Sequence, residues 1–258
     1  MNNNKNKIKV YEVKNMLPEI PLPREIDERL GEVHGIHLLI MKCKSGKSNL
    51  VANMLCSDCF YGGTKPIFET VYIISPTVKI DKSSQIYLRE EMEDRFIVSD
   101  DVDNIDAMIQ DIINYQSQFD IKDPDNLPPR IALVLDDISG KLKRNSLVTH
   151  IFSRYRHYNM TIFLSNQTCR SLPSICRSMA TCIYLSSCYS TLERQKILEE
   201  WGEYFGGTDS LEKMWDEAVK ERFNYLYLKL DDVKPRAFQL GSNGLNEINF
   251  NNNEKNNI

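Results

Sequence analysis

Three consecutive residues, Gly46, Lys47 and Ser48, have the types and the order that bind the phosphates of a nucleotide. Such a site needs backbone N–H groups at the start of a helix, a lysine ammonium beside the β- and γ-phosphate oxygens, and a hydroxyl on the Mg²⁺ ion. The tripeptide follows an apolar run at 36–41 and precedes apolar positions with helical spacing at 50–55. The sequence therefore predicts a strand, a phosphate loop and a helix in that order.

The match to the phosphate-loop pattern G-x-x-x-x-G-K-[ST] is incomplete, because Met41 stands at the position of the first glycine. A glycine there eases a positive φ angle and a close approach of the backbone to the phosphates. Lys44 adds a bulky side chain to the loop. A Gly-Lys-Ser tripeptide also occurs in ordinary turns, so the interpretation depends on the motifs that follow. The residues predicted to bind the nucleotide are Lys44, Ser45, Gly46, Lys47, Ser48 and Asn49, with Ser48 also a ligand of Mg²⁺.

Two carboxylates, Asp136 and Asp137, end the second informative stretch, directly after an apolar run at 131–135. Such a run predicts a strand that is buried on both faces, and ligands of parallel sheets bind at the carboxyl ends of such strands. Asp136 is predicted to hold Mg²⁺ through water, and Asp137 to orient or deprotonate the attacking water. The alternative is that the pair only ends the strand and begins a turn with Ser139 and Gly140.

A polar amide follows a further predicted strand at 160–164, where the chain reads Ser165, Asn166 and Gln167. An amide at the tip of a strand beside the phosphate loop can hydrogen-bond the γ-phosphate or the attacking water, and can report hydrolysis to the rest of the domain. Gln167 is the predicted sensor, and Asn166 is the second candidate. The alternative for Asn166 is that it caps a helix or a turn.

These residues require a sheet that brings the ends of distant strands together. Alternation of apolar strand-like runs and helical segments predicts an α/β fold with a central, mainly parallel sheet. Strands are predicted at 36–41, 70–75, 95–98, 131–135, 160–164 and 180–185, with helices between them that include 104–119 and 145–158. Later segments are predicted as helices at 191–204 and 211–221, with Trp201 and Trp215 in the core, and as short strands at 225–230 and 236–240.

The composition predicts a globular, intracellular protein. The 258 residues are 41% hydrophobic and 26% charged, and the net charge of -4 excludes a generally cationic nucleic-acid binder. The chain has no apolar run of about 18 residues and no apolar signal core at its start, so we expect no membrane insertion. An odd number of cysteines, 7, predicts reduced thiols. The Asn-rich segments 1–16 and 241–258 are predicted to be disordered tails around a P-loop ATPase domain at 17–240, and the equal alternative for 241–258 is an arm that binds a partner.

Four features occur together in the stretch 133–185. They are the Asp136-Asp137 pair, the Arg156-His157 pair at the end of the next predicted helix, the strand that leads to Gln167, and the Leu172-Pro173 segment. In this combination the stretch resembles the core of the viral genome-packaging ATPases of poxviruses, other large DNA viruses, virophages and Polinton-like elements, in the FtsK/HerA superfamily. The segment YIISPT at 72–77 resembles a strand of the same family, and the resemblance covers about residues 33–240.

The resemblance implies a P-loop NTPase of the RecA-like, ASCE type with three layers, assembled as a hexameric ring. Such a ring hydrolyses ATP with Mg²⁺ and drives double-stranded DNA into a preformed capsid, with the capsid protein at the portal vertex as a further partner. The setting that it implies is an infected host cell, in the cytoplasmic virus factory or the nucleus, or the virion itself.

The resemblance also implies a role for Arg156. In this superfamily an arginine from one subunit reaches the γ-phosphate bound by its neighbour, and Arg156 has the matching position before the strand of the predicted sensor, with Arg154 as the second candidate. An arginine in trans is the expected device for coupling hydrolysis around a ring. The alternative is that Arg154, Arg156 and His157 form a solvated helix end favoured by the helix dipole. The predicted catalytic residues are therefore Asp137, Gln167 and Arg156, and the predicted metal ligands are Ser48 and Asp136.

Two other functions fit parts of the sequence. A small P-loop kinase would share the phosphate loop, but such kinases usually carry an arginine-bearing lid and an acceptor pocket between later strands, and the spacing of Arg156 and Gln167 fits a ring motor better. A non-catalytic nucleotide-binding assembly protein is suggested by Met41 and Lys44 in the loop. Hydrolysis that DNA stimulates would separate the motor from both alternatives.

Overall fold

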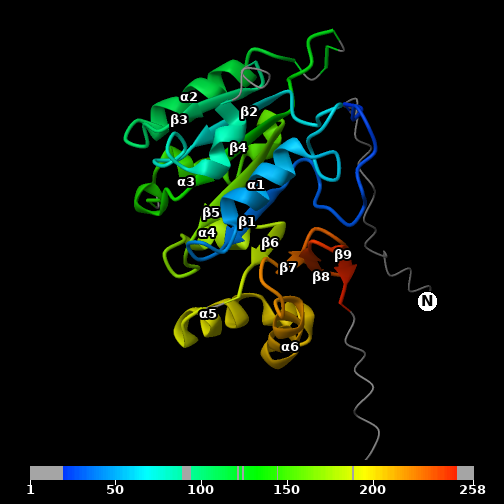
Figure 1. Cartoon of the computed structure of the whole chain (residues 1–258). Helices are drawn as coiled ribbons and strands as arrows, with labels where there is room; N and C mark the ends of the chain where they lie inside the picture. The colour runs from blue at the N-terminus through cyan, green and yellow to red at the C-terminus, as the bar shows by residue number, and fades with distance from the viewer. Residues whose placement is uncertain are drawn as a thin grey trace, which may run out of the picture.

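Nine strands form one sheet within the residues that the computed structural model describes, which are 20–88, 94–120, 122–123, 125–143, 145–187 and 189–248 (Figure 1). The strands are β1 (Ile36–Ile40), β2 (Thr70–Ile74), β3 (Phe96–Ser99), β4 (Ile131–Asp136), β5 (Met160–Asn166), β6 (Cys182–Leu185), β7 (Tyr225–Lys229), β8 (Arg236–Gly241) and β9 (Gly244–Glu247). Their order across the sheet is β3-β2-β4-β5-β1-β6-β7-β8-β9.

The centre of the sheet is parallel. β1 lies between β5 and β6 and is parallel to both, and β4 lies parallel between β2 and β5. The carboxyl ends of these strands therefore meet at one edge of the sheet, as the predicted site requires. β7, β8 and β9 follow in antiparallel order. Because β7 runs antiparallel to β6, and β8 antiparallel to β7, β7 begins and β8 ends at the same edge where β1 and β4 end.

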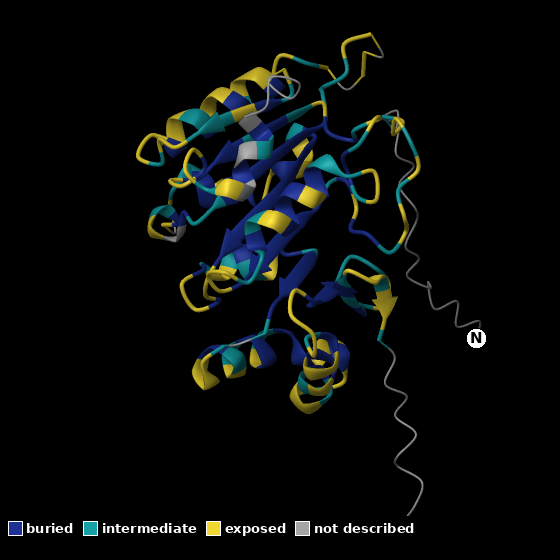
Figure 2. Ribbon diagram, in the orientation of Figure 1, coloured by how far each residue is buried: buried dark blue, intermediate teal, exposed yellow. Residues whose placement is uncertain are grey.

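Helices cover both faces of the sheet and give three layers. They are α1 (Lys47–Cys56), α2 (Ile105–Gln116), α3 (Leu147–Ile151), α4 (Ser174–Ser178), α5 (Thr191–Trp201) and α6 (Thr208–Ala218), with 3₁₀ turns at Lys82–Leu88, Ser139–Lys141, Tyr155–Tyr158 and Gly202–Phe205. Leu38 and Ile40 join the core cluster that contains α2, α3, α5 and α6, whereas Leu39 joins the cluster of α1. Figure 2 shows the sheet buried between helices whose outer faces are exposed. Trp201 and Trp215 are 2% and 0% exposed, so their predicted place in the core is confirmed.

The prediction of one helix over 145–158 is wrong. α3 ends at Ile151, and a separate 3₁₀ turn at Tyr155–Tyr158 follows it. The Ser153 hydroxyl donates to the carbonyl oxygen of His150 at 2.9 Å. This side-chain hydrogen bond satisfies a backbone carbonyl in the last turn of the helix. Asn159 then adopts φ 46, which turns the chain directly into β5. Arg156 is thus placed on a 3₁₀ turn and not at the end of a long helix.

The boundary predicted at residue 240 lies too early. β8 continues to Gly241, and β9 pairs with it so that Gly244 lies opposite Gly241 across a tight turn. The turn is possible because Gly244 adopts φ 90, which an L side chain rarely allows. Pairing of the backbone overrides the tail-like composition of 241–248. The other predicted tail residues, 1–16 and 249–258, lie outside the described part of the chain.

Candidate nucleotide-binding site

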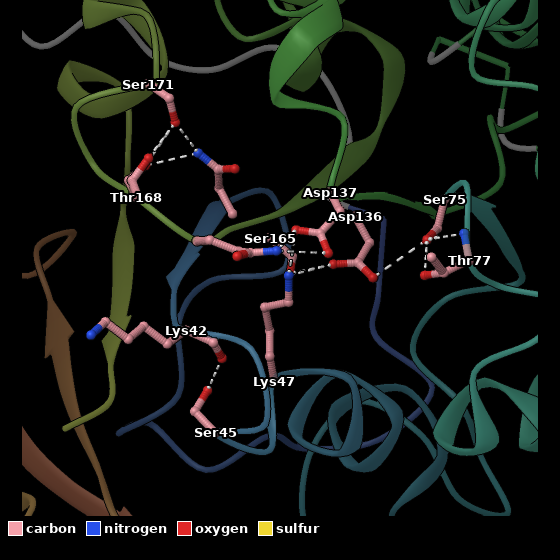
Figure 3. Close-up of polar contacts among 12 residues, drawn as sticks. Lys42, Ser45, Lys47, Ser75, Thr77, Asp136, Asp137, Ser165, Thr168 and Ser171 are labelled. Atoms are coloured by element: carbon pink, nitrogen blue, oxygen red, sulfur yellow. Dashed lines mark hydrogen bonds and ion pairs between the residues drawn. The ribbon is translucent and has the colours of Figure 1, made fainter. Parts of the chain in front are cut away.

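The loop between β1 and α1 bends at two residues with left-handed backbone, Lys44 at φ 64 and Gly46 at φ 93. Met41, at the position of the first glycine of the motif, is fully buried and its N–H continues the ladder to β5. It therefore extends the strand and takes no part in the bend. The Ser45 hydroxyl donates to the carbonyl oxygen of Lys42 at 2.7 Å and closes the loop on itself (Figure 3). The loop thus forms without the first glycine, although a left-handed Lys44 costs about 1 kcal/mol.

Lys47 begins α1 and points its ammonium between the two predicted carboxylates (Figure 3). Its Nζ lies 2.8 Å from Asp137 Oδ1 and 3.1 Å from Asp136 Oδ1. The Lys47 side chain is only 8% exposed, and a charge removed from water is tolerated where it is paired. The structure therefore brings together, from the start of α1 and the end of β4, the lysine and both carboxylates that the sequence singled out.

Hydroxyls from both neighbouring strands hold the carboxylate of Asp136. Ser165 in β5 donates to Asp136 Oδ1 at 2.5 Å, and Ser75, which follows β2, donates to Oδ2 at 3.4 Å (Figure 3). Both serines are buried. Hydrogen bonds of this kind orient carboxylates that bind metal ions. The sequence analysis missed both serines, although each directly follows an apolar strand run.

Asp137 leaves β4 with a left-handed backbone at φ 52, which aspartate tolerates better than most residues. Its N–H donates to the carbonyl oxygen of Ser165 at 3.1 Å. Gln167 Nε2 lies 3.4 Å and 3.5 Å from the two carboxylate oxygens of Asp137. Asn166 instead donates through Nδ2 to the carbonyl oxygen of Thr168 at 2.8 Å and caps the following turn. Gln167 is therefore the amide that faces Asp137, and Asn166 has the capping role that was its alternative.

A cavity of about 970 Å³ lies in front of these groups, within the size range of small-molecule sites. Ser48 and Asp136 both line it, and their oxygens suit Mg²⁺, which binds one or two protein groups and takes its other ligands from phosphates and water. Within the described part of the chain, no three or more His, Cys, Asp or Glu side chains form a metal cluster. Ser45 turns its hydroxyl into the loop, whereas the other predicted nucleotide-binding residues line the cavity: Lys44, Gly46, Lys47, Ser48 and Asn49.

The opposite wall of the cavity comes from β7 and β8, which the sequence analysis did not connect to the site. The Tyr225 hydroxyl donates to the carbonyl oxygen of Ser45 at 3.0 Å, across 180 residues of sequence. A Cβ on Gly46 would lie 2.4 Å from Tyr225 Oη and 3.1 Å from Phe223 Cδ1, so this close approach requires glycine. The aromatic start of the predicted strand at 225–230 was visible in the sequence, but it does not reveal which loop the strand will face.

Arg156 does not lie in this cavity. It precedes β5, whereas Gln167 follows that strand, and seven strand residues span about 23 Å. Arg156 is exposed, its Nε donates to the Tyr155 hydroxyl at 3.0 Å, and its guanidinium lies 5.5 Å from the centre of that ring. Arg154 and His157 are exposed beside it. In this arrangement none of these side chains can reach a nucleotide bound by its own chain.

No protein-family model and no curated protein matches the sequence. Solved structures, however, match its fold. The genome-packaging NTPase B204 from Sulfolobus turreted icosahedral virus 2, in complex with AMPPCP, matches with a TM-score of 0.53 and 17% identity, over 80% of this chain and 97% of that chain. Its complex with ATP-gammaS matches with a TM-score of 0.50 and 16% identity, over the same shares of both chains. The chain shares its fold with this viral packaging NTPase.

A second match is the cytoplasmic domain of the type VII secretion ATPase EccC from Thermomonospora curvata. The TM-score is 0.57 at 15% identity, over 84% of this chain and 26% of that chain. The predicted fold class, the α/β fold of P-loop ASCE ATPases with a mainly parallel central sheet, is therefore confirmed. No helix among the described residues is both long enough and apolar enough to cross a membrane.

Proposed function

We propose that this protein is an ATPase that translocates double-stranded DNA into preformed capsids. The observation that carries the proposal is the position of the Lys47 ammonium between Asp136 and Asp137, with Gln167 against Asp137, at the mouth of a cavity formed by a phosphate loop. These are the groups that phosphoryl transfer needs, since its catalysis consists of positioning and of stabilising charge. The fold shared with a genome-packaging NTPase supports DNA as the substrate that is moved.

Each group has a distinct task in hydrolysis. Lys47 exchanges its carboxylate partners for the β- and γ-phosphate oxygens of bound ATP. Ser48 and Asp136 are the residues that would hold Mg²⁺, which would supply positive charge against the phosphates. Asp137 accepts a proton from the attacking water, and Gln167 orients that water through its amide. Ser165 and Ser75 keep the Asp136 carboxylate in one orientation while Lys47 moves.

The oligomer we propose is a hexameric ring in which Arg156 completes the site of the neighbouring subunit. The support is its position, because an exposed arginine at the far end of β5 is too distant from its own cavity. A guanidinium supplied in trans stabilises charge in the transition state and makes hydrolysis depend on contact between subunits. The further partners we propose are double-stranded DNA and the capsid protein at the portal vertex, and the setting is an infected cell or the virion.

The decisive experiment measures ATP hydrolysis by the purified protein with and without double-stranded DNA, together with Lys47→Ala and Arg156→Ala. We expect DNA to stimulate the wild type and neither variant. We also expect mixtures of the two variants to regain activity, because an intact site of an Arg156→Ala subunit then faces Arg156 of a Lys47→Ala subunit. Arg156→Lys is the matched control, since it keeps the charge but loses the planar fork.

Two outcomes would contradict the motor. ATP binding without hydrolysis under any condition would leave a non-catalytic assembly protein. Phosphate transfer to a small acceptor, without any effect of DNA, would identify a kinase. Failure of the mixed variants to recover activity, with DNA stimulation intact in the wild type, would exclude Arg156 as the residue that acts in trans.

A further inference from the structure

The cavity extends beyond the groups that serve the phosphates. Its lining also includes Leu50 and Asn53 of α1, Phe60, Phe223, which precedes β7, and Leu240 in β8. None of these five side chains carries a charge, so they are unsuited to phosphate oxygens. Apolar and aromatic walls with a few polar groups are typical of sites for flat organic ligands. These uncharged lining residues therefore suit a ligand group of different chemistry from the triphosphate.

Phe223 is the most unusual residue of this wall. Its backbone adopts φ 67, a left-handed conformation that a bulky residue rarely takes, and its side chain is 48% exposed. A strained backbone that holds an apolar ring in solvent has no evident benefit for folding, and such strain gathers at binding sites. The ring lies against the phosphate loop, since a Cβ on Gly46 would be 3.1 Å from Phe223 Cδ1. Phe223 thus presents an aromatic ring directly beside the phosphate site.

Two contacts, one of Tyr225 and one of the Phe223 ring itself, bear on the position of this ring and on the kind of group that packs against it. The hydrogen bond from Tyr225 to the carbonyl oxygen of Ser45 ties the start of β7, two residues after Phe223, to the phosphate loop. The guanidinium of Arg222 lies 4.6 Å from the centre of the Phe223 ring. A delocalised cation thus lies over this ring, and aromatic rings and guanidinium planes are the surfaces on which bases stack.

We propose that Phe223 is the platform for the nucleobase of the bound nucleoside triphosphate, with Arg222 as its partner in stacking. This inference rests on the proposed function, because it needs a triphosphate in the loop. Every base has a π-face, so the ring increases affinity for nucleotides without selecting one base. It makes a nucleoside triphosphate, and not an inorganic polyphosphate, the ligand class of the site.

The test compares the binding of ATP and of inorganic tripolyphosphate, both with Mg²⁺, by titration calorimetry. We expect Phe223→Ala to weaken ATP binding roughly tenfold and to leave tripolyphosphate binding unchanged within about twofold. Phe223→Gly should weaken ATP binding to the same extent. Because glycine also removes the backbone strain, this variant keeps the test valid if Phe223→Ala folds poorly. Phe223→Trp should retain ATP binding. Tyr204→Ala is the matched control, because Tyr204 is an aromatic residue 58% exposed outside the cavity lining.

The outcomes separate this inference from the function on which it rests. Equal ATP affinity in the wild type and Phe223→Gly would overturn the base platform and leave the triphosphate site intact. An equal loss of affinity for ATP and for tripolyphosphate in the Phe223 variants would also overturn the base platform, because the ring would then only support the phosphate loop. Failure of the wild type to bind either ligand would overturn the nucleotide site itself.

Discussion

Lys47 donates to Asp137, with Nζ 2.8 Å from Oδ1, and this ion pair joins the first turn of α1 to the end of β4. The same ammonium lies 3.1 Å from Asp136. Two neighbouring carboxylates repel each other, and the lysine between them offsets that repulsion. Under the proposed function, nucleotide binding is an exchange of partners, in which Lys47 leaves the carboxylates for the phosphates.

Removal of the ammonium should abolish this exchange. Lys47→Ala is expected to weaken ATP binding roughly 100-fold, the loss of two charge-assisted hydrogen bonds, and to bring hydrolysis to background. Lys213→Ala is the matched control, because Lys213 is an exposed lysine of α6 outside the cavity lining. Titration calorimetry and phosphate release check both variants. ATP affinity of Lys47→Ala within about tenfold of the wild type would contradict the assigned role.

The two carboxylates should respond differently to neutral substitutions. Asparagine tolerates the left-handed φ 52 of position 137, so Asp137→Asn should fold normally, bind ATP within a few-fold and lose about 10²- to 10⁴-fold in kcat. Asp136→Asn should instead raise the Mg²⁺ concentration needed for half-maximal activity, since Asp136 is assigned to the metal. Steady-state kinetics over a Mg²⁺ series distinguish the two effects. The same Mg²⁺ dependence in both variants would show that the roles are not divided in this way.

Glu193 should stabilise the segment that follows Gln167. Its buried carboxylate, in the first turn of α5, accepts hydrogen bonds from the backbone N–H groups of Cys169 and of Arg170, the latter at 3.0 Å. Glu193→Ala leaves these donors without their acceptor and should lower the free energy of unfolding by about 2 kcal/mol.

The Glu193→Ala substitution should also slow hydrolysis, because Gln167 is then less firmly placed against Asp137. We expect kcat to fall more than KM rises, and Glu193→Gln, which keeps an acceptor oxygen, to be intermediate. Glu199→Ala on the exposed face of the same helix is the control for both urea unfolding and kinetics. A variant with lowered stability and unchanged kcat would limit Glu193 to a structural role.

His37 should make the protein less stable in mild acid. It is fully buried in β1, with its ring stacked 4.5 Å from that of Phe163, and burial lowers the pKa of His37 to about 3. An unfolded chain has a histidine pKa of about 6.5, so between pH 3 and 6.5 the unfolded state binds the extra proton and stability falls as the pH falls. From pH 7.5 to 4.5 this one residue should lower the free energy of unfolding by about 3 kcal/mol.

Urea unfolding at both pH values checks the expectation for His37. His37→Phe loses the bond to the Tyr184 hydroxyl and is expected to be less stable at pH 7.5, yet its stability should change less with pH than that of the wild type. His150→Gln, at an exposed position of α3, should leave the pH dependence of the wild type unchanged. An equal loss on acidification in the wild type and His37→Phe would show that other groups dominate.

The sequence by itself determined the parts of the site that depend on residues close together in the chain. The order of apolar run, Gly46-Lys47-Ser48 and apolar helix, and the Asp136-Asp137 pair after a buried run, are local patterns, and they were sufficient for the fold class. Local patterns also misled: a single helix was predicted through Arg156, and an Asn-rich tail was predicted where β9 forms. In both places hydrogen bonds and turn geometry overrode composition and periodicity.

Only the tertiary structure decided what encloses the cavity. Two reversals of direction after β6 bring Tyr225 against Ser45 and place Phe223 over Gly46, and no local pattern in either segment specifies that meeting. Parallel pairing of β4 with both β2 and β5 decided that Ser75 and Ser165 hold Asp136 from opposite sides. The physical reason is that strand order and register follow from the packing of side chains that are distant in the sequence, whereas propensity acts only between neighbours along the chain.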